Sequence, residues 1–194
     1  MARPREFEQT AALDFAVRTF WAQGFEATSV QDLCAAMNLN PGSLYGSFGD
    51  KRALFLASLD RYMDTVVHKA LECIATEPSG IAGIRVFFNR LIRSAPIFKR
   101  RRGCLITSTA AELAPRDPEV AAKVRQHLDR VEAAFAGALS RAKAAGELRE
   151  GIGANNAGFL LCLLQGLNVL LKTRPRQIEL QRIVNNALRG LVAP

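Results

Sequence analysis

Asn40, Gly42 and Ser43 form a cluster of small polar residues whose types and spacing suit contacts with nucleic acid. Short polar side chains at the N-terminal end of a helix can come close to phosphates and base edges. Asn40 followed by Pro41 is the usual pairing of an N-cap residue with a proline at the first helical position. The pattern therefore predicts a short helix, reaching about Phe48, whose first turn could bind a duplex.

A second short helix is predicted immediately before this one, from near Ser29 to Asn38, with Asp32 completing a loose capping box. This spacing is that of a helix-turn-helix. Such a motif needs small residues where its helices cross, a turn residue that tolerates positive φ, an apolar plug and two inward anchors. The sequence supplies them in that order: Ala35 with Ala36, Asn38, Leu39, and Leu44 with Phe48.

Helical periodicity continues through the rest of the chain, and no sustained strand alternation appears. We predict an all-α fold of nine helices, with a three-helix helix-turn-helix head at the N-terminus and a six-helix body. The first helix ends at Gly24, and the fourth runs from a cap at Asp50 to about Glu77. The remaining five are expected at about 81–94, 104–113, 118–146, 154–172 and 176–192.

The chain has 194 residues and a net charge of +8, which by itself suggests an anionic partner. The charge is not in the head, however: residues 1–55 carry a net −1, and the remaining residues carry +9. Its densest cluster is the run Lys99–Arg102. This run is either a solvated connector or a contact for phosphate or another anion.

Several other classes of protein are not indicated. The most apolar stretch, Phe159–Leu171, has 13 residues and includes Gln165 and Asn168, so we predict a buried helix and no membrane span. The four cysteines form no C-x-x-C pair, which favours a reducing cytoplasm. Catalytic signatures and metal-ligand spacing are missing, so we expect no enzyme activity, no metal and no cofactor.

The N-terminal residues resemble the pattern of TetR-family transcriptional regulators. The resemblance covers about 45 residues and rests on Leu13, Ala16, Phe20, Gly24-Phe25, Thr28, Val30, Leu33, Leu39, Ser43-Leu44-Tyr45, Phe48, Lys51 and Leu54. Three positions depart from it: Gly46 and Ser47 replace larger side chains that are common in the family, and Asn38 replaces a common turn glycine.

The resemblance implies roles for the matched positions. Thr28 and Ser29 would contact backbone phosphates, Gly42, Ser43 and Tyr45 would lie in or beside the major groove, and Lys51 would hold a phosphate. Tyr45 could instead pack within the head. The predicted DNA-binding set is Thr28, Ser29, Asn40, Pro41, Gly42, Ser43, Tyr45, Ser47 and Lys51.

The last two predicted helices are apolar over wide faces. Together they have more apolar surface than one body needs to cover its own core. A two-fold interface with two helices from each subunit would use that surface, and it would set the recognition helices ~34 Å or more apart. The predicted homodimer interface is Leu160, Leu163, Leu164, Leu167 and Leu171 with Ile183, Ala187, Leu188 and Leu191.

The resemblance also implies an effector pocket in the body. Candidate pocket residues are Phe87, Phe88, Leu91, Phe98, Cys104, Thr107, Phe135, Cys162 and Gln165, with Asn89, Glu112 and Asn168 as further polar contacts. For the apolar residues the alternative is plain core. The basic run and a helix N-terminus would raise the thiolate fraction of Cys104, so this thiol is either an electrophile sensor or an unreactive cysteine. Cys34, Cys73 and Cys162 are interpreted as core.

These features predict a helix-turn-helix DNA-binding domain at 1–52 and a ligand-binding and dimerisation domain at 53–194. The predicted function is a cytoplasmic transcriptional regulator, a repressor that binds a palindromic operator as a homodimer and is released by a small-molecule effector of unknown identity. The alternative is an architectural or protein-interaction factor of the same fold that needs no effector.

Overall fold

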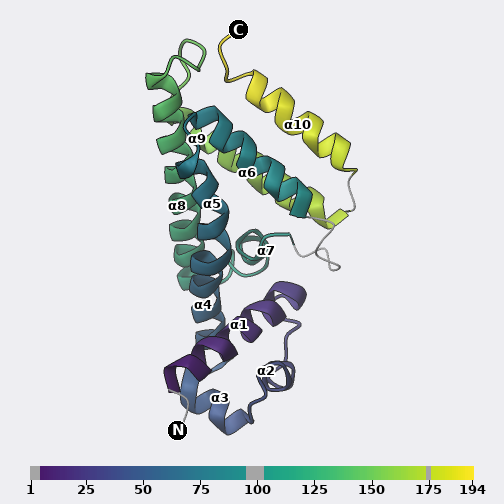
Figure 1. Ribbon diagram of the computed structural model, residues 1–194. Coiled ribbons are helices and arrows are strands. Elements are labelled where there is room, and N and C mark those ends of the chain that lie inside the picture. Colours follow the sequence, from purple (N-terminus) through teal and green to yellow (C-terminus); the bar gives the residue numbers. More distant parts are fainter. Residues whose placement is uncertain (1–4, 95–102, 174–175) are drawn as a thin grey trace. The chain divides into compact units, whose positions relative to one another are not determined.

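The computed structural model describes residues 5–94, 103–173 and 176–194, and Figure 1 traces their helices. Phe98 and the basic run 99–102 lie outside the described residues. The α-helices are α1 (Arg5–Gln23), α2 (Val30–Met37), α3 (Pro41–Phe48), α4 (Lys51–Tyr62), α5 (His68–Thr76), α6 (Gly80–Ser94), α7 (Leu105–Glu112), α8 (Pro118–Ala144), α9 (Ala157–Leu170) and α10 (Gln177–Arg189). Short 3₁₀ turns flank α9 at Ala154–Asn156 and Leu171–Thr173.

The all-α prediction is confirmed: the described residues contain no strand, only an isolated bridge between Leu148 and Val192. The predicted long fourth helix corresponds to α4 and α5, joined by a π-helical turn at Met63–Val67. Counting that continuous run as one helix gives the expected nine among the described residues. The π turn was not predicted, because apolar spacing does not reveal one widened turn within a helix.

The described residues form two compact units. The head unit contains those within Met1–Val66 and Cys104–Val124, and the body unit contains those within Val67–Gly103 and Arg125–Pro194. The head unit therefore includes all of α4, all of α7 and the first turns of α8. Our predicted boundary after residue 52 would instead cut α4 and assign the rest of it, with α7 and α8, to the body domain.

Aromatic packing of α1 against α4 makes the core of the head unit. The fully buried ring of Phe20 packs edge-on against Phe55 at 4.9 Å between ring centroids, and Phe25 lies 4.9 Å from the same ring. Leu44 of α3 is fully buried, as predicted for an inward anchor, and Phe48 is half-buried. This packing fixes α3 against α4 and leaves its other side exposed.

Helix α6 lies at the centre of the body unit, against both α5 and α10. Two glycines allow close helix packing: a Cβ at Gly83 would lie 2.8 Å from the carbonyl oxygen of Ile74, and one at Gly80 would lie 2.9 Å from the backbone nitrogen of Ala142. The rings of Phe87, Phe88 and Phe135 pack together nearby with centroids 5.3–5.8 Å apart.

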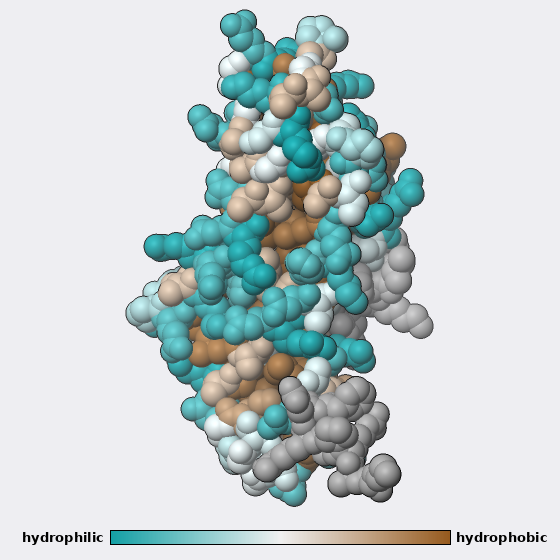
Figure 2. All heavy atoms as spheres, turned by 60° about the vertical axis from the view of Figure 1, so that its left-hand side comes forward, coloured by the Kyte–Doolittle hydropathy of each residue, from teal (hydrophilic) through white to brown (hydrophobic). Residues whose placement is uncertain are grey.

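Hydrophilic side chains cover most of the face turned forward in Figure 2, and hydrophobic atoms show in recesses between them. One stretch, Ala154–Thr173, has the length and hydropathy of a membrane-spanning helix, with 28% of its most apolar window buried. Core helices of soluble proteins share this length and hydropathy, so these two properties alone are weak evidence for a membrane span.

Candidate nucleic-acid interface

The N-terminus of α2 is fixed by a complete capping box. The Ser29 hydroxyl accepts a hydrogen bond from the Asp32 backbone N–H at 3.0 Å, and the Asp32 carboxylate accepts from the Ser29 N–H at 2.9 Å. The Ser29 hydroxyl also donates to that carboxylate at 2.6 Å, and these hydrogen bonds lower the pKa of Asp32. The prediction of a capping box is confirmed, and it orients the exposed Ser29 side chain.

The turn between α2 and α3 has the predicted left-handed residue. Asn38 adopts φ 54° and ψ 45° and ends α2, and it is the one non-glycine residue with positive φ among those described. The backbone N–H of Leu39 then donates to the carbonyl oxygen of Cys34 at 3.0 Å. Asparagine tolerates this conformation because its short side chain has little steric conflict there.

Helix α3 begins as predicted, with Asn40 as N-cap and Pro41 as its first residue. The Asn40 side-chain oxygen accepts from the Ser43 N–H at 2.8 Å and so caps the helix. The Asn40 residue is also exposed to solvent. On the outer side of α3 the side chain of Tyr45 is 47% exposed. The exposed residues of this helix are Pro41, Gly42, Ser43, Tyr45 and Gly46, and Ser47 is half-buried.

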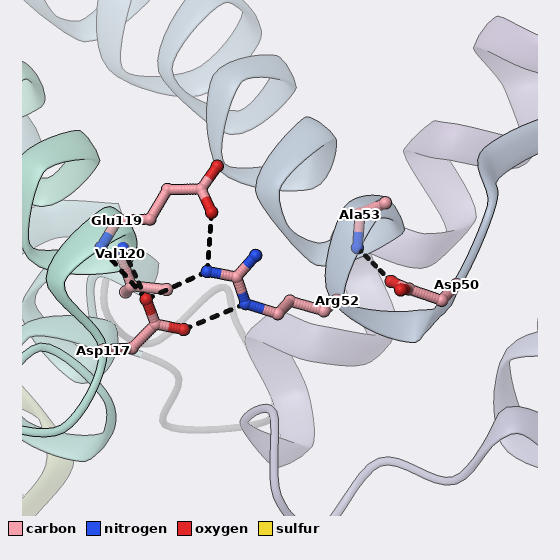
Figure 3. Close-up of polar contacts among 6 residues, drawn as sticks. All are labelled: Asp50, Arg52, Ala53, Asp117, Glu119 and Val120. Carbon is pink, nitrogen blue, oxygen red and sulfur yellow. Dashed lines mark hydrogen bonds and ion pairs between the residues drawn. The ribbon is translucent and has the colours of Figure 1, made fainter.

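Helix α4 begins beside this surface, and its first residues point in different directions. The Lys51 ammonium lies 4.3 Å from the centroid of the Phe25 ring, a cation–π contact that orients a side chain with many rotamers. Asp50 caps α4 by accepting from the Ala53 N–H at 2.7 Å, as Figure 3 shows. The contact ties the Lys51 side chain to the loop that precedes α2.

Arg52 points toward the start of α8 (Figure 3). Its guanidinium donates to both carboxylate oxygens of Asp117 at 3.0 Å and pairs with Glu119 at 2.7 Å. Asp117 also caps α8 by accepting from the backbone N–H groups of Glu119 and Val120. The Arg52 hydrogen bonds are the main cause of a lowered Asp117 pKa, and the carboxylates raise the pKa of Arg52.

One member of the predicted DNA-binding set differs from expectation. Thr28 is 1% exposed, and its hydroxyl donates to the carbonyl oxygen of Gly24. A phosphate could not reach this hydroxyl without displacing the loop, so Thr28 supports the chain before α2. The other eight predicted residues all have exposed or half-buried side chains around α2, α3 and the start of α4.

Most residues of the predicted dimer interface are buried or half-buried within a single chain, and Ile183 is the exposed member. Leu160, Leu164 and Leu167 are at most 7% exposed within a single chain, and so are Leu188 and Leu191. Leu163, Leu171 and Ala187 are half-buried, and Ile183 is 39% exposed. The apolar side chains left at the surface of α9 and α10 are Phe159, Val169, Leu170, Ile178 and Ile183.

The candidate effector residues are divided between the two units. Cys104, Thr107 and Glu112 belong to the head unit, and the other described candidates belong to the body unit. Phe87, Phe88 and Phe135 are buried against one another, and Leu91 and Gln165 are half-buried. Cys162 is exposed on the side of α9 opposite Leu160, so its interpretation as core was wrong, whereas Cys34 and Cys73 are buried as predicted.

Glu112 and Asn89 also have partners other than an effector. The Glu112 carboxylate accepts hydrogen bonds from backbone N–H groups of the loop before α2, and Asn89 accepts from the side chain of Gln181 at 2.9 Å. Cys104 lies half-exposed just before α7, against the buried Tyr62 phenol, whose pKa is raised chiefly by burial. Within the described residues, no group of three His, Cys, Asp or Glu side chains could hold a metal ion.

The Glu112 contact and the Arg52–Asp117 pair were missed as parts of this site. Their partners lie 65–87 positions apart in the chain, so no local motif links them. A weak signal existed in Gly24, a glycine at the end of α1, which the structure uses to admit the Glu112 carboxylate.

Comparison with known proteins agrees with this geometry. Residues 12–58 match the tetR family of bacterial regulatory proteins, and residues 80–187 match the tetracyclin repressor-like C-terminal domain. The chain is 29% identical to the HTH-type transcriptional repressor ComR of Escherichia coli over 189 residues, which cover 96% of this chain and 90% of ComR. It is 33% identical to the HTH-type transcriptional regulator YezE of Bacillus subtilis over 148 residues, 76% of each chain.

Among solved structures, a cysteine mutant of the TetR family regulator CifR superimposes with a TM-score of 0.85 at 28% identity, covering 97% of this chain and 99% of CifR. That protein was solved with double-strand operator DNA of 26 base pairs. Both parts of the chain match the same family, and its relatives are named as regulators of transcription. The chain therefore belongs to the TetR family and is a DNA-binding transcriptional regulator, not an enzyme.

Proposed function

We propose that the chain is a ligand-responsive repressor that binds a palindromic operator as a homodimer and leaves it when a small molecule binds. The observation that carries the DNA-binding part is the exposed outer side of α3, held between a capping box, a left-handed turn and the start of α4. The named activities of ComR, a repressor, and of CifR, solved on operator DNA, support the assignment.

The proposed DNA contacts follow from exposure. The side chains of Ser43 and Tyr45, together with the backbone of Gly42, would enter the major groove. Ser29 and Lys51 flank α3 and would bind phosphates, with the N-terminus of α2 contributing backbone donors. Asn40, Pro41, Gly42 and Ser47 complete the set, and Thr28 is left out because its hydroxyl is satisfied internally.

Selection of binding sites from a random double-strand library tests this proposal. The wild-type protein should enrich a two-fold symmetric sequence whose half-sites are about one helical turn or more apart. Enrichment of no sequence, or of a site without two-fold symmetry, would contradict a palindromic operator.

The dimer would use the exposed apolar side of α9 together with α10. Phe159 is 48% exposed, Val169 is 54% exposed and Cys162 lies between them in sequence on the same side of the helix. A helix apolar on all sides needs a second surface to cover it, and a partner subunit supplies one. This arrangement also explains the hydropathy of Ala154–Thr173 in a soluble protein acting in the cytoplasm.

Sedimentation of two matched variants tests the interface. Phe159→Asp should produce monomers, since a buried unpaired charge destabilises an interface. Phe15→Asp is the control, because Phe15 lies on α1 in the head unit and is 44% exposed. A Phe159→Asp protein that remained dimeric would move the interface away from this side of α9.

The effector part of the proposal rests mainly on the body unit, which makes up most of the ligand-binding domain predicted at 53–194. Phe87, Phe88, Leu91, Phe135 and Gln165 remain the candidate residues there, with Cys104 and Thr107 of α7 as further candidates in the head unit. A thermal-shift screen should find a compound that raises the melting temperature and weakens binding to the selected duplex. A stabilising compound that left DNA binding unchanged would favour an effector-independent factor.

A further inference from the structure

We propose that Glu112, at the end of α7, is a positioning residue for DNA binding: its carboxylate holds the loop that leads into α2 although it touches no DNA itself. This inference rests on the proposed function, because it concerns how the head is kept in its DNA-binding geometry. No local motif predicts it, and the sequence alone suggested an effector contact for this residue.

The contact is made to the backbone, so it constrains the loop directly. One carboxylate oxygen of Glu112 accepts from the Glu26 N–H at 2.9 Å, and the other accepts from the Phe25 N–H at 3.3 Å. Two adjacent N–H donors on one ionised carboxylate form a charge-assisted pair, which is stronger than two neutral hydrogen bonds. The loop from Gly24 to Ser29 is therefore fixed at its centre by a residue from distant sequence.

Gly24 provides an independent sign that this approach is built into the fold. It adopts φ +84°, and a Cβ placed there would lie 2.8 Å from one Glu112 carboxylate oxygen and 3.1 Å from the other. Only glycine combines that conformation with room for the carboxylate. The end of α1 and the end of α7 thus fit together at one point.

The loop that Glu112 holds leads directly to groups placed in the DNA-binding surface. Phe25 supports Lys51 through the cation–π contact at 4.3 Å, and Thr28 hydrogen-bonds back to Gly24 just before Ser29 caps α2. Displacing Phe25 and Glu26 would therefore disturb both Lys51, which is proposed to bind a phosphate, and the first turn of α2. Small displacements matter because base and phosphate contacts depend on hydrogen-bond geometry.

The second attachment of the same segment shows that α7 and the start of α8 hold the head at two places. The Arg52 guanidinium, next to Lys51 in sequence, is bound by Asp117 and Glu119 (Figure 3). Glu112 fixes the loop before α2, and Asp117 fixes the start of α4. Both ends of the helix-turn-helix are thereby anchored to one segment, within Cys104–Val124.

The charge of Glu112 allows a decisive test, because electrostatic repulsion and loop positioning predict opposite changes in DNA affinity when the carboxylate is removed. Removing a carboxylate from a DNA-binding surface should strengthen binding to a polyanion if electrostatics alone decides. If Glu112 positions the loop, Glu112→Ala should weaken binding. Glu26→Gln is the matched control: it removes a charge from an exposed side chain of the same loop and keeps both backbone donors.

The experiment measures the affinities of the dimeric protein for the duplex selected by the wild type and for a scrambled duplex, well below the melting temperature. Glu112→Ala should weaken binding to the selected duplex at least about fivefold, with a smaller loss on the scrambled duplex. Glu112→Gln, which keeps one oxygen acceptor, should fall between Glu112→Ala and the wild type. Glu26→Gln should bind as tightly as the wild type or more tightly.

Unchanged or tighter binding by Glu112→Ala would overturn the inference, as would an equal loss on both duplexes, which indicates a damaged head and not a mispositioned one. A wild-type protein that prefers no sequence would instead overturn the proposed function, and this inference with it. The preference of the wild type for its selected duplex thus separates the two failures.

Discussion

The head unit and the body unit each have an aromatic core, but within the described residues only the head unit adds ion pairs between helices far apart in sequence. In the head unit, charged side chains join helices far apart in sequence: Arg52 binds Asp117, Arg61 binds Asp14 and Lys123 binds Asp60 at distances of 2.6–3.0 Å. In the body unit, glycine contacts and the packed rings of Phe87, Phe88 and Phe135 hold α5, α6 and α8 together.

This difference suits the task of each unit. Hydrogen-bonded ion pairs are directional, so they fix the geometry on which DNA contacts depend, while each exposed pair contributes little to stability. Apolar packing contributes most of the free energy of folding but constrains direction less. We therefore expect substitutions in the body unit to act mainly on stability and those in the head unit to act mainly on DNA binding.

The largest stability effect is expected from Phe135→Ala. The Phe135 ring is 0% exposed and stacks on Phe88 at 5.8 Å, so its removal leaves a cavity and should lower the free energy of unfolding by about 3–5 kcal/mol. Urea denaturation at fixed protein concentration measures this value. Phe15→Ala, at an exposed position, is the control, and a similar loss in both variants would contradict the comparison.

A smaller loss is expected from Gly83→Ala. The added methyl group would lie 2.8 Å from the carbonyl oxygen of Ile74 and 3.1 Å from the Ile74 Cα, both backbone atoms that cannot turn aside. The free energy of unfolding should fall by about 1–3 kcal/mol, since α5 and α6 must separate. If denaturation shows no loss, the helices are less closely packed than we describe.

Gly46→Ala should act in the opposite direction on stability. A Cβ at Gly46 meets no atom within 4 Å, and alanine is a better helix former, so the head should gain up to about 1 kcal/mol. The same methyl group would stand between α3 and the groove, so binding to the selected duplex should weaken. The melting temperature and the dissociation constant of this one variant measure the two effects. A rise in both stability and DNA affinity would contradict a close approach of DNA at Gly46.

The smallest effect concerns Asp117→Asn and depends on pH. Because Arg52 lowers the pKa of folded Asp117, its contribution to stability is full above the ordinary aspartate pKa and is lost as pH falls through the lowered value. The variant should therefore be less stable than the wild type at neutral pH, and the two should converge in acid. Melting temperatures from pH 7 to pH 2 measure this, with exposed Asp129→Asn on the same helix as control; parallel curves would contradict the pairing.

The same contrast explains which features could be predicted from sequence. The caps at Ser29, Asn40 and Asp50 were predicted because each donor and acceptor lie three residues apart, and the left-handed turn was predicted from Asn38 alone. Local steric and hydrogen-bond rules fully decide such features.

The orientation of helices in the body unit could not be predicted, because it depends on tertiary packing and not on local rules. Helix α9 is apolar on every side, so its periodicity could not show that Leu160 and Leu164 face the core while Phe159 and Cys162 face outward. Contacts between distant residues, such as that of Glu112 with Glu26 in the head unit, leave at most a weak local signal, here Gly24. Tertiary packing alone settles these cases.

The most direct test of the central claim compares Tyr45→Ala and Lys51→Ala for binding to the selected and scrambled duplexes over a range of salt concentrations. Tyr45→Ala should lose most of the preference for the selected duplex. Lys51→Ala should weaken binding to both duplexes equally and reduce the slope of log affinity against log salt by about one. Wild-type affinities and salt slopes in both variants would contradict the assignment of α3 and the start of α4 as the DNA-binding surface.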